Sequence, residues 1–258
     1  VLRIVAVQLE KEHDLKSKVK GAMVYPAVIL TVMFVIGIIM LTFVLPKLTA
    51  VFKDMGTELP VMTQVVIKIS DALRNHGLLV AIGLIVLILF GQYFFRQKTG
   101  KKVLSWISIK FPLFSPLVKQ MNCARFARIY SSLLKSGVGA VDALKIISHT
   151  LTNYYYQKAI LGSVEDIQRG VALSKILADH QDIFPIMVSQ IVEVGEETGK
   201  TESVLLQLAE FYEAEVDQIT KNLSSIIEPL LMVVIGASVG FFAVAMLMPM
   251  YSMMDTIK

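Results

Sequence analysis

The sequence predicts an all-α integral membrane protein, in which three transmembrane helices accompany a cytoplasmic six-helix bundle. Hydrophobic residues make up 55% of the 258 residues and the mean hydropathy is +0.64, which is too apolar for an ordinary soluble domain. The apolar residues gather in three uncharged stretches, at 21–46, 77–95 and 229–254. Much of the remaining sequence follows the helical period of 3.6 residues.

The three uncharged stretches are long enough to cross a bilayer. A hydrocarbon core of about 30 Å needs about 20 helical residues. A buried core helix is the alternative, but such a helix rarely runs this long without a polar face. We therefore place transmembrane helices at 21–46, 77–95 and 227–249.

The first and third spans resemble each other as two copies of one repeat. Pro26 and Pro46 have the same separation as Pro229 and Pro249. The same register aligns seven further identical pairs: Gly37 with Gly240, Val1 with Val204, Leu2 with Leu205, Ala6 with Ala209, Glu10 with Glu213, Asp14 with Asp217 and Lys18 with Lys221. This agreement favours an internal repeat, in which an amphipathic helix runs into a span.

The four prolines are expected to bracket the two spans as structural turns. Proline costs no hydrogen bond in the first turn of a helix, and it stops a helix after the last turn. Residues 111–203 have no repeat counterpart before Val1. We therefore expect the first cytoplasmic domain to be mostly missing, with residues 1–20 as its end.

Basic residues near the spans predict the orientation of the chain, because Lys and Arg accumulate on the cytoplasmic side. They cluster before the first span and after the second. This places 1–20 and 96–226 in the cytoplasm and the segments 47–76 and 250–258 on the opposite side of the membrane. In the segment 47–76, apolar residues at helical spacing predict an amphipathic helix along the outer interface: Val61, Val65, Ile69, Ala72 and Leu73.

The cytoplasmic segment 96–226 is predicted to be a bundle of helical hairpins. Gly137 and Gly170 are expected to end helices, and Asn153 to cap one. The six expected helices lie at 121–138, 140–150, 153–170, 172–180, 184–194 and from Thr201 onward.

The stretch "VGEETGKT" at 194–201 looks at first like a phosphate-binding loop. Such a loop needs four residues between its glycines and lies between a strand and a helix. Gly195 and Gly199 enclose three residues, two of them acidic, between two predicted helices. We interpret the stretch as a tight helix–helix turn, with positive φ at both glycines and Thr201 as an N-cap.

No catalytic grouping is evident, and we expect no enzyme activity, no cofactor and no nucleic-acid partner. The single cysteine, Cys123, excludes an intramolecular disulfide, and four scattered histidines lack metal-ligand spacing. Candidate partner-binding residues are the charged groups Glu196, Glu197, Arg125, Arg128 and Glu228. The alternatives are a solvated loop for the first two, lipid headgroup contact for the arginines, and a helix-dipole role for Glu228.

Several stretches together resemble the inner-membrane platform proteins of type IV pili and type II secretion systems, the type II secretion system protein F family. These are "ARFARIYSSLLKSGV", "FPIMVSQIVEVGEETGK", "YPAVILTVMFVIGIIMLTFVLPKL" with "MGTELP", and "EFYEAEVDQITKNLSSIIEP". The last is more similar to the pilus branch. The resemblance implies two cytoplasmic helical domains, three spans and membership of a machine powered by a separate cytoplasmic hexameric ATPase. It also implies a location in the bacterial inner membrane, with 47–76 and 250–258 in the periplasm. The implied partners are that assembly or retraction ATPase, pilins, other inner-membrane assembly proteins, membrane lipid and further copies of the chain.

Two rival functions remain open at this point. One is a platform for the pseudopilus of a type II secretion system. The other is a small membrane transporter subunit, although transporters place ionisable residues within their spans. The interiors of these three spans carry none, and Glu228 stands at a boundary.

Overall fold

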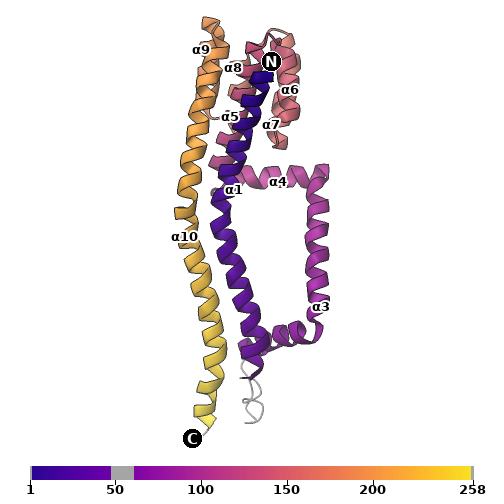
Figure 1. Ribbon diagram of the computed structural model, residues 1–258, viewed down its shortest axis with the longest axis vertical. Coiled ribbons are helices and arrows are strands. Elements are labelled where there is room, and N and C mark those ends of the chain that lie inside the picture. Colours follow the sequence, from indigo (N-terminus) through magenta and orange to yellow (C-terminus); the bar gives the residue numbers. More distant parts are fainter. Residues whose placement is uncertain (1, 48–60, 257–258) are drawn as a thin grey trace. The chain divides into compact units, whose positions relative to one another are not determined.

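The computed structural model describes residues 2–47 and 61–256, without the side chains of 2–9, 61–62, 224 and 248–256. Within these ranges no strand forms, which confirms the all-α prediction. The α-helices are labelled in Figure 1. The helical elements are α1 (Leu2–Ile39), the π-helical segment η1 (Met40–Val44), α3 (Val61–Arg96), α4 (Lys98–Lys110), α5 (Ser115–Lys135), α6 (Ala140–Thr150), α7 (Tyr154–Gln168), α8 (Leu173–Ala178), α9 (Ile186–Thr198) and α10 (Thr201–Thr256).

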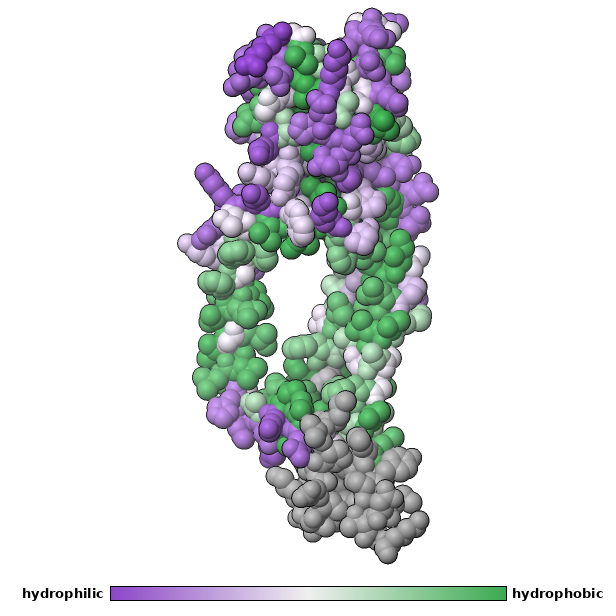
Figure 2. Space-filling model, turned by 180° about the vertical axis from the view of Figure 1, so that it is seen from behind, coloured by the Kyte–Doolittle hydropathy of each residue, from purple (hydrophilic) through white to green (hydrophobic). Residues whose placement is uncertain are grey.

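Three helices are long and apolar enough to cross a membrane: 10–47, 63–96 and 201–247. Their most apolar windows have mean hydropathies of 3.0, 2.5 and 2.5, yet only 6%, 0% and 11% of the residues in these windows are buried. A core helix would bury such side chains against protein. The exposed apolar surface, coloured green in Figure 2, therefore fits contact with lipid and confirms the three candidate spans.

The chain divides into two compact units. The bundle unit contains residues 1–21 and 93–222, and the span unit contains 22–92 and 223–258. The bundle unit has a helix at each of the six predicted places and two further helical segments, so the predicted count of six is too low. The two further segments are the first part of α1 and helix α4, which was not predicted.

Local signals placed most helix ends in the bundle unit correctly. Helix α6 has the predicted bounds. The Asn153 side chain caps α7 by accepting a hydrogen bond from the Tyr155 backbone N–H at 3.0 Å. Gly137 and Gly170 follow the ends of α5 and α7 with φ of +78° and +87°, a left-handed conformation that suits glycine.

The predicted turns at the four prolines are wrong. Pro26 lies inside α1, Pro229 and Pro249 lie inside α10, and Pro46 lies in helical residues just after η1. A proline inside a helix removes one backbone hydrogen bond. Apolar helices that cross a membrane tolerate this loss, because neighbouring groups and local helix adjustments satisfy the freed carbonyl.

The first part of α3 turns its polar side toward the other spans. The backbone leaves the helical conformation at His76, which separates this part from the apolar span. The Thr63 hydroxyl donates to the Ala245 carbonyl at 2.9 Å, and the Ser70 hydroxyl donates to the Leu41 carbonyl. Val65 and Ile69, from the predicted apolar stripe, stay exposed. Their placement at the outer membrane interface remains a prediction.

Cys123 lies at the centre of the bundle unit, in a core shared with Phe126, Tyr156 and Phe184. The side chain is 0% exposed. Burial, the largest cause, raises the pKa of the thiol to about 12. Because the thiolate is the reactive species, both its ionisation and its access are suppressed.

We expect Cys123 to resist maleimide labelling in the folded protein at pH 8. With a pKa of about 12, roughly one thiol in ten thousand is ionised at that pH. Labelling should become stoichiometric in sodium dodecyl sulfate. Mass spectrometry of folded and unfolded samples measures both states, and rapid labelling of the folded chain would contradict the buried position.

Candidate partner-binding surface

The turn between α9 and α10 closes the end of α9 with paired backbone hydrogen bonds. The Lys200 N–H donates to the Gly195 carbonyl at 3.0 Å, and the Gly199 N–H donates to the Glu196 carbonyl at 3.4 Å. Gly199 has φ of +67°. This is the Schellman arrangement of a helix C-terminus. Both N–H groups are thus engaged within the turn, and helices rather than a strand and a helix flank it, as the helix–helix turn interpretation predicted.

Two details of the turn differ from the prediction. Gly195 is helical, and its role is close packing, since a Cβ there would lie 3.0 Å from the Thr201 Cα. The N-cap position belongs to Lys200, because its carbonyl accepts from the Val204 N–H at 3.1 Å. Thr201 is the first residue of α10. Sequence pattern could not distinguish these alternatives, since they depend on how closely α9 approaches α10.

The Glu196 side chain caps the short helix α8. Its carboxylate accepts from the Leu173 N–H at 2.7 Å, from the Ser174 N–H at 3.1 Å and from the Ser174 hydroxyl at 2.6 Å. A carboxylate at a helix N-terminus satisfies donors that the helix itself leaves unpaired. These three hydrogen bonds give Glu196 partners within the chain. Its charge also contributes, after burial, to raising the pKa of the Tyr130 hydroxyl to about 12.

Glu197 differs from its neighbour. Its side chain is exposed, and no described residue forms an ion pair with it. Of the two acidic residues proposed for partner binding, Glu197 is the one whose carboxylate is available. Partner binding by either residue remains a prediction.

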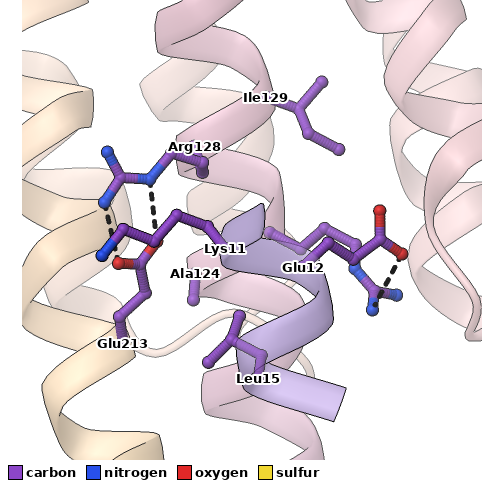
Figure 3. A pocket seen from close by; sticks show the side chains of 8 residues that line it. Lys11, Glu12, Leu15, Ala124, Arg128, Ile129 and Glu213 are labelled. Carbon is purple, nitrogen blue, oxygen red and sulfur yellow. Dashed lines mark hydrogen bonds and ion pairs between the residues drawn. The ribbon is translucent and has the colours of Figure 1, made fainter. Parts of the chain in front are cut away.

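Arg128 forms a two-point contact with Glu213, which joins α5 to α10 (Figure 3). The Arg128 Nε lies 2.7 Å from Glu213 Oε1, and Nη2 lies 2.8 Å from Oε2. The two side chains are 13% and 14% exposed. Such planar pairing is specific to arginine and a carboxylate, and it is stronger than a single hydrogen bond.

Arg125 is deeper, at 5% exposed. Its Nη1 donates to the Thr152 hydroxyl at 2.5 Å, and its Nη2 lies 3.6 Å from Glu12 on α1. Burial lowers the pKa of the guanidinium, and the Glu12 charge opposes this shift. The structure thus places both arginines inside the bundle unit. Binding of a partner or a lipid headgroup stays a prediction, and it would require either arginine to exchange an internal contact for an external one.

A third ionic contact joins α1 to α10. The two carboxylate oxygens of Asp217 lie 2.7 Å from Lys18 Nζ and 2.6 Å from Lys221 Nζ. The two lysines hold the pKa of Asp217 at about 2, against an ordinary value of 3.8. Because this pKa is lowered by folding, the stabilisation is present above about pH 4 and disappears as the pH falls through about 2.

Glu228 lies within α10, in the span unit. The residue is exposed. No described residue forms an ion pair or a side-chain hydrogen bond with it, so the contacts within the described part of the chain do not account for the charge. The helix-dipole alternative is wrong, because α10 begins at Thr201 and Glu228 lies many turns from either end, whereas the dipole acts only within the terminal turn. Partner binding by Glu228 remains a prediction.

Comparison with known proteins identifies the family. The family described as type II secretion system (T2SS), protein F matches residues 1–46 and 126–249, well over half of the chain. The chain belongs to this family. The predicted resemblance is thereby confirmed.

Named relatives of the T2SS protein F family match nearly the whole chain. The type IV pilus assembly protein PilC of Thermus thermophilus is 33% identical over 258 residues, covering 100% of this chain and 64% of its own length. PilC of Pseudomonas aeruginosa is 33% identical over 250 residues, covering 96% and 67%. The type II secretion system protein F of Vibrio cholerae is 28% identical over 255 residues, covering 98% and 62%. The higher identity to the pilus proteins agrees with the predicted branch, and the chain spans about two thirds of these relatives.

Glu213 and Asp217 were not identified from the sequence as the ion-pair partners of basic residues in the bundle unit. Glu213 and Asp217 appeared as identities of the internal repeat, together with Lys18. The alignment of the two repeat copies could have indicated these ion pairs, because the same charged residue stands at the same position in both copies. The partner across the bundle could not be assigned, since Arg128 is 85 residues away from Glu213 in sequence.

Proposed function

We propose that this chain belongs to the inner-membrane platform of a type IV pilus machine. In this role it couples a separate cytoplasmic ATPase to the insertion or extraction of pilin subunits, as part of a homo-oligomer. The bundle unit would face the cytoplasm and meet the ATPase, while the span unit would meet pilins and other inner-membrane assembly proteins. The observation that carries the proposal is the 33% identity to type IV pilus assembly proteins across the whole chain.

The geometry supports a coupling role over a nucleotide-hydrolysing one. In the turn at 195–201, the Gly199 and Lys200 N–H groups close the end of α9, so neither is available to a phosphate. The bundle unit also contains ionic contacts that join α1, α5 and α10. Two of these helices, α1 and α10, continue into the span unit as unbroken helices. In this proposal, α1 and α10 are the segments through which a force on the bundle unit would reach the span unit.

Co-purification tests the proposed partners. The chain, expressed at native level with an affinity tag, is extracted in mild detergent and its bound proteins are identified. We expect a pilus ATPase and pilins, and we expect a Glu197→Lys variant of equal abundance to retain pilins but lose part of the ATPase. Recovery of neither protein, together with substrate flux through reconstituted vesicles, would favour a transporter and contradict the proposal.

Cysteine labelling tests the proposed orientation, with the buried Cys123 as a silent background. We place cysteines at the exposed positions Asp71 and Lys102. Asp71→Cys should react with an impermeant maleimide in cells whose outer membrane alone is permeable. Lys102→Cys should react only after the inner membrane is broken. The reverse pattern would place the bundle unit outside the cytoplasm and remove its access to the ATPase.

Glu228→Gln is expected to reduce surface pili about tenfold at normal platform abundance. The exposed carboxylate has no described partner within the chain, and losing one charge-assisted contact with a pilin or a facing protomer is worth about 1.4 kcal/mol or more. Pili are counted by electron microscopy. Glu193→Gln, at an exposed position on α9, is the control. Wild-type pilus counts would contradict a partner contact at Glu228.

Type II secretion remains the second candidate, because the family description and the Vibrio cholerae relative carry that name. The two machines differ in what they assemble. Complementation distinguishes them: the chain should restore surface pili in a host lacking its pilus platform, and it should fail to restore protein secretion in a host lacking the secretion platform.

A further inference from the structure

Helix α4 has its apolar side turned outward. Val103, Leu104, Trp106 and Ile107 are 40%, 51%, 52% and 44% exposed. The spacing of residues 103, 106 and 107 places these side chains on one face of the helix. Ser105, by contrast, is 7% exposed. An amphipathic helix on a soluble bundle has the opposite arrangement, with apolar residues toward the core.

Polar contacts attach α4 to the rest of the bundle unit. The Tyr154 N–H donates to the Ser105 hydroxyl at 3.1 Å, at the start of α7. The Asn153 amide donates to the Ser105 carbonyl at 3.3 Å and to the Ser108 hydroxyl at 3.4 Å. Asn153 is also the residue that caps α7. These contacts fix which side of α4 faces the bundle, so the outward direction of the apolar face is built into the fold.

The start of α4 is basic and directly follows a candidate membrane span. Only Gln97 separates Lys98, the first residue of α4, from Arg96, the last residue of α3. Lys101 and Lys102 follow within the next turn, and both are exposed. Gly100 permits this abrupt change of direction, since a Cβ there would lie 2.0 Å from the Phe94 carbonyl oxygen. The chain thus leaves the span and enters a basic, outwardly apolar helix within a few residues.

We propose that α4 is a membrane-surface helix that binds the anionic headgroup layer of the leaflet at which α3 ends. Val103, Leu104, Trp106 and Ile107 enter the boundary between headgroups and acyl chains. Lys98, Lys101 and Lys102 attract anionic phospholipid. Tryptophan and lysine are the residue types that favour this region of a bilayer.

The occupant we assign to the apolar face is lipid, because of charge and chain connectivity. A polybasic segment beside a span is attracted to the negative surface of a cytoplasmic leaflet. The chain between the span and α4 is a single residue, so the start of α4 cannot lie far from the bilayer surface. A protein partner would have to reach the same face within that layer. The inference requires that α3 crosses a membrane, but it does not depend on a role in pilus assembly.

Trp106 is the single tryptophan of the chain, so its fluorescence tests the inference without any substitution. The full chain is reconstituted in vesicles that contain anionic phospholipid. We expect strong quenching by lipids brominated near the headgroup, weaker quenching by lipids brominated near the chain end, and little quenching by iodide in the water. Strong iodide quenching without bromolipid quenching would place α4 in water. Protection from both quenchers would place a protein over the face, and either result would overturn the proposal.

The lysines are tested with a charge-matched pair of variants. Energy transfer from Trp106 to acceptor-labelled lipids measures how strongly anionic lipid is enriched over zwitterionic lipid near α4. The triple variant Lys98→Gln, Lys101→Gln, Lys102→Gln should lower this enrichment by at least about threefold. The control removes three exposed lysines elsewhere on the bundle unit, with Lys145→Gln, Lys158→Gln and Lys175→Gln. Equal enrichment in both variants would overturn the assignment of the three α4 lysines.

Discussion

We expect Arg128→Ala to lower the free energy of unfolding of the bundle unit by about 2–4 kcal/mol. The substitution leaves the Glu213 carboxylate, which is 14% exposed, without the two N–H groups that now solvate it. Removal of one member of a largely buried pair costs more than the pair itself contributes, because a desolvated charge remains. The expected fall in the melting temperature is about 4–16 °C. It is measured on the full chain in detergent, by following the reactivity of the buried Cys123 with a fluorogenic maleimide.

Two matched variants separate this explanation from a general effect of losing an arginine. Lys135→Ala breaks a looser surface contact, in which the nitrogen–oxygen distance to Glu202 is 3.8 Å and both side chains are largely exposed. It should cost less than about 0.5 kcal/mol. The double variant Arg128→Met, Glu213→Leu should recover most of the loss, since no charge is then left unpaired. If Arg128→Ala costs no more than Lys135→Ala, the pair does not hold α5 to α10.

We expect Glu196→Ala to destabilise the bundle unit by about 2–3 kcal/mol. Two backbone N–H groups and one hydroxyl lose their acceptor, and their residues Leu173 and Ser174 are only 2% and 5% exposed. Glu196→Gln retains an acceptor oxygen and should cost about half as much. The same Cys123 reactivity measurement gives the melting temperatures.

Glu197→Ala is the matched control for Glu196→Ala. This neighbouring carboxylate is exposed, and its removal should change stability by less than about 0.5 kcal/mol. A loss of pili in Glu197→Ala at unchanged stability would therefore indicate a partner contact. A loss of pili in Glu196→Ala would follow from the unfolding of α8. Equal stability of Glu196→Ala and wild type would show that the carboxylate does not cap α8 in solution.

The sequence alone was sufficient for properties that depend on short stretches of chain. Apolar length predicted the three spans, and the 3.6-residue period predicted the bundle helices. Asn153, Gly137 and Gly170 marked helix ends correctly, because caps and left-handed turns involve residues within a few positions of each other. Family membership was also evident from several short stretches taken together.

The prolines show where such local reasoning failed. Proline is unfavourable within an ordinary helix, so the sequence predicted breaks at the four positions. The structure instead has α1 and α10 running through Pro26 and Pro229. Proline removes one backbone hydrogen bond both in a helix in water and in a helix in a membrane. What differs is the surroundings, since a helix in an apolar environment has no water to replace its remaining backbone hydrogen bonds and therefore stays helical.

The tertiary structure alone decided which charged residues are available to a partner and which belong to the fold. Glu196 and Glu197 are adjacent and chemically identical, yet only Glu196 reaches the N-terminus of α8, 22 residues earlier in sequence. Arg128 meets Glu213 across 85 residues. The apolar face of α4 points outward because Ser105 pairs with the start of α7, 49 residues later. Local propensity depends on neighbours within one helical turn, whereas each of these contacts depends on how distant helices pack.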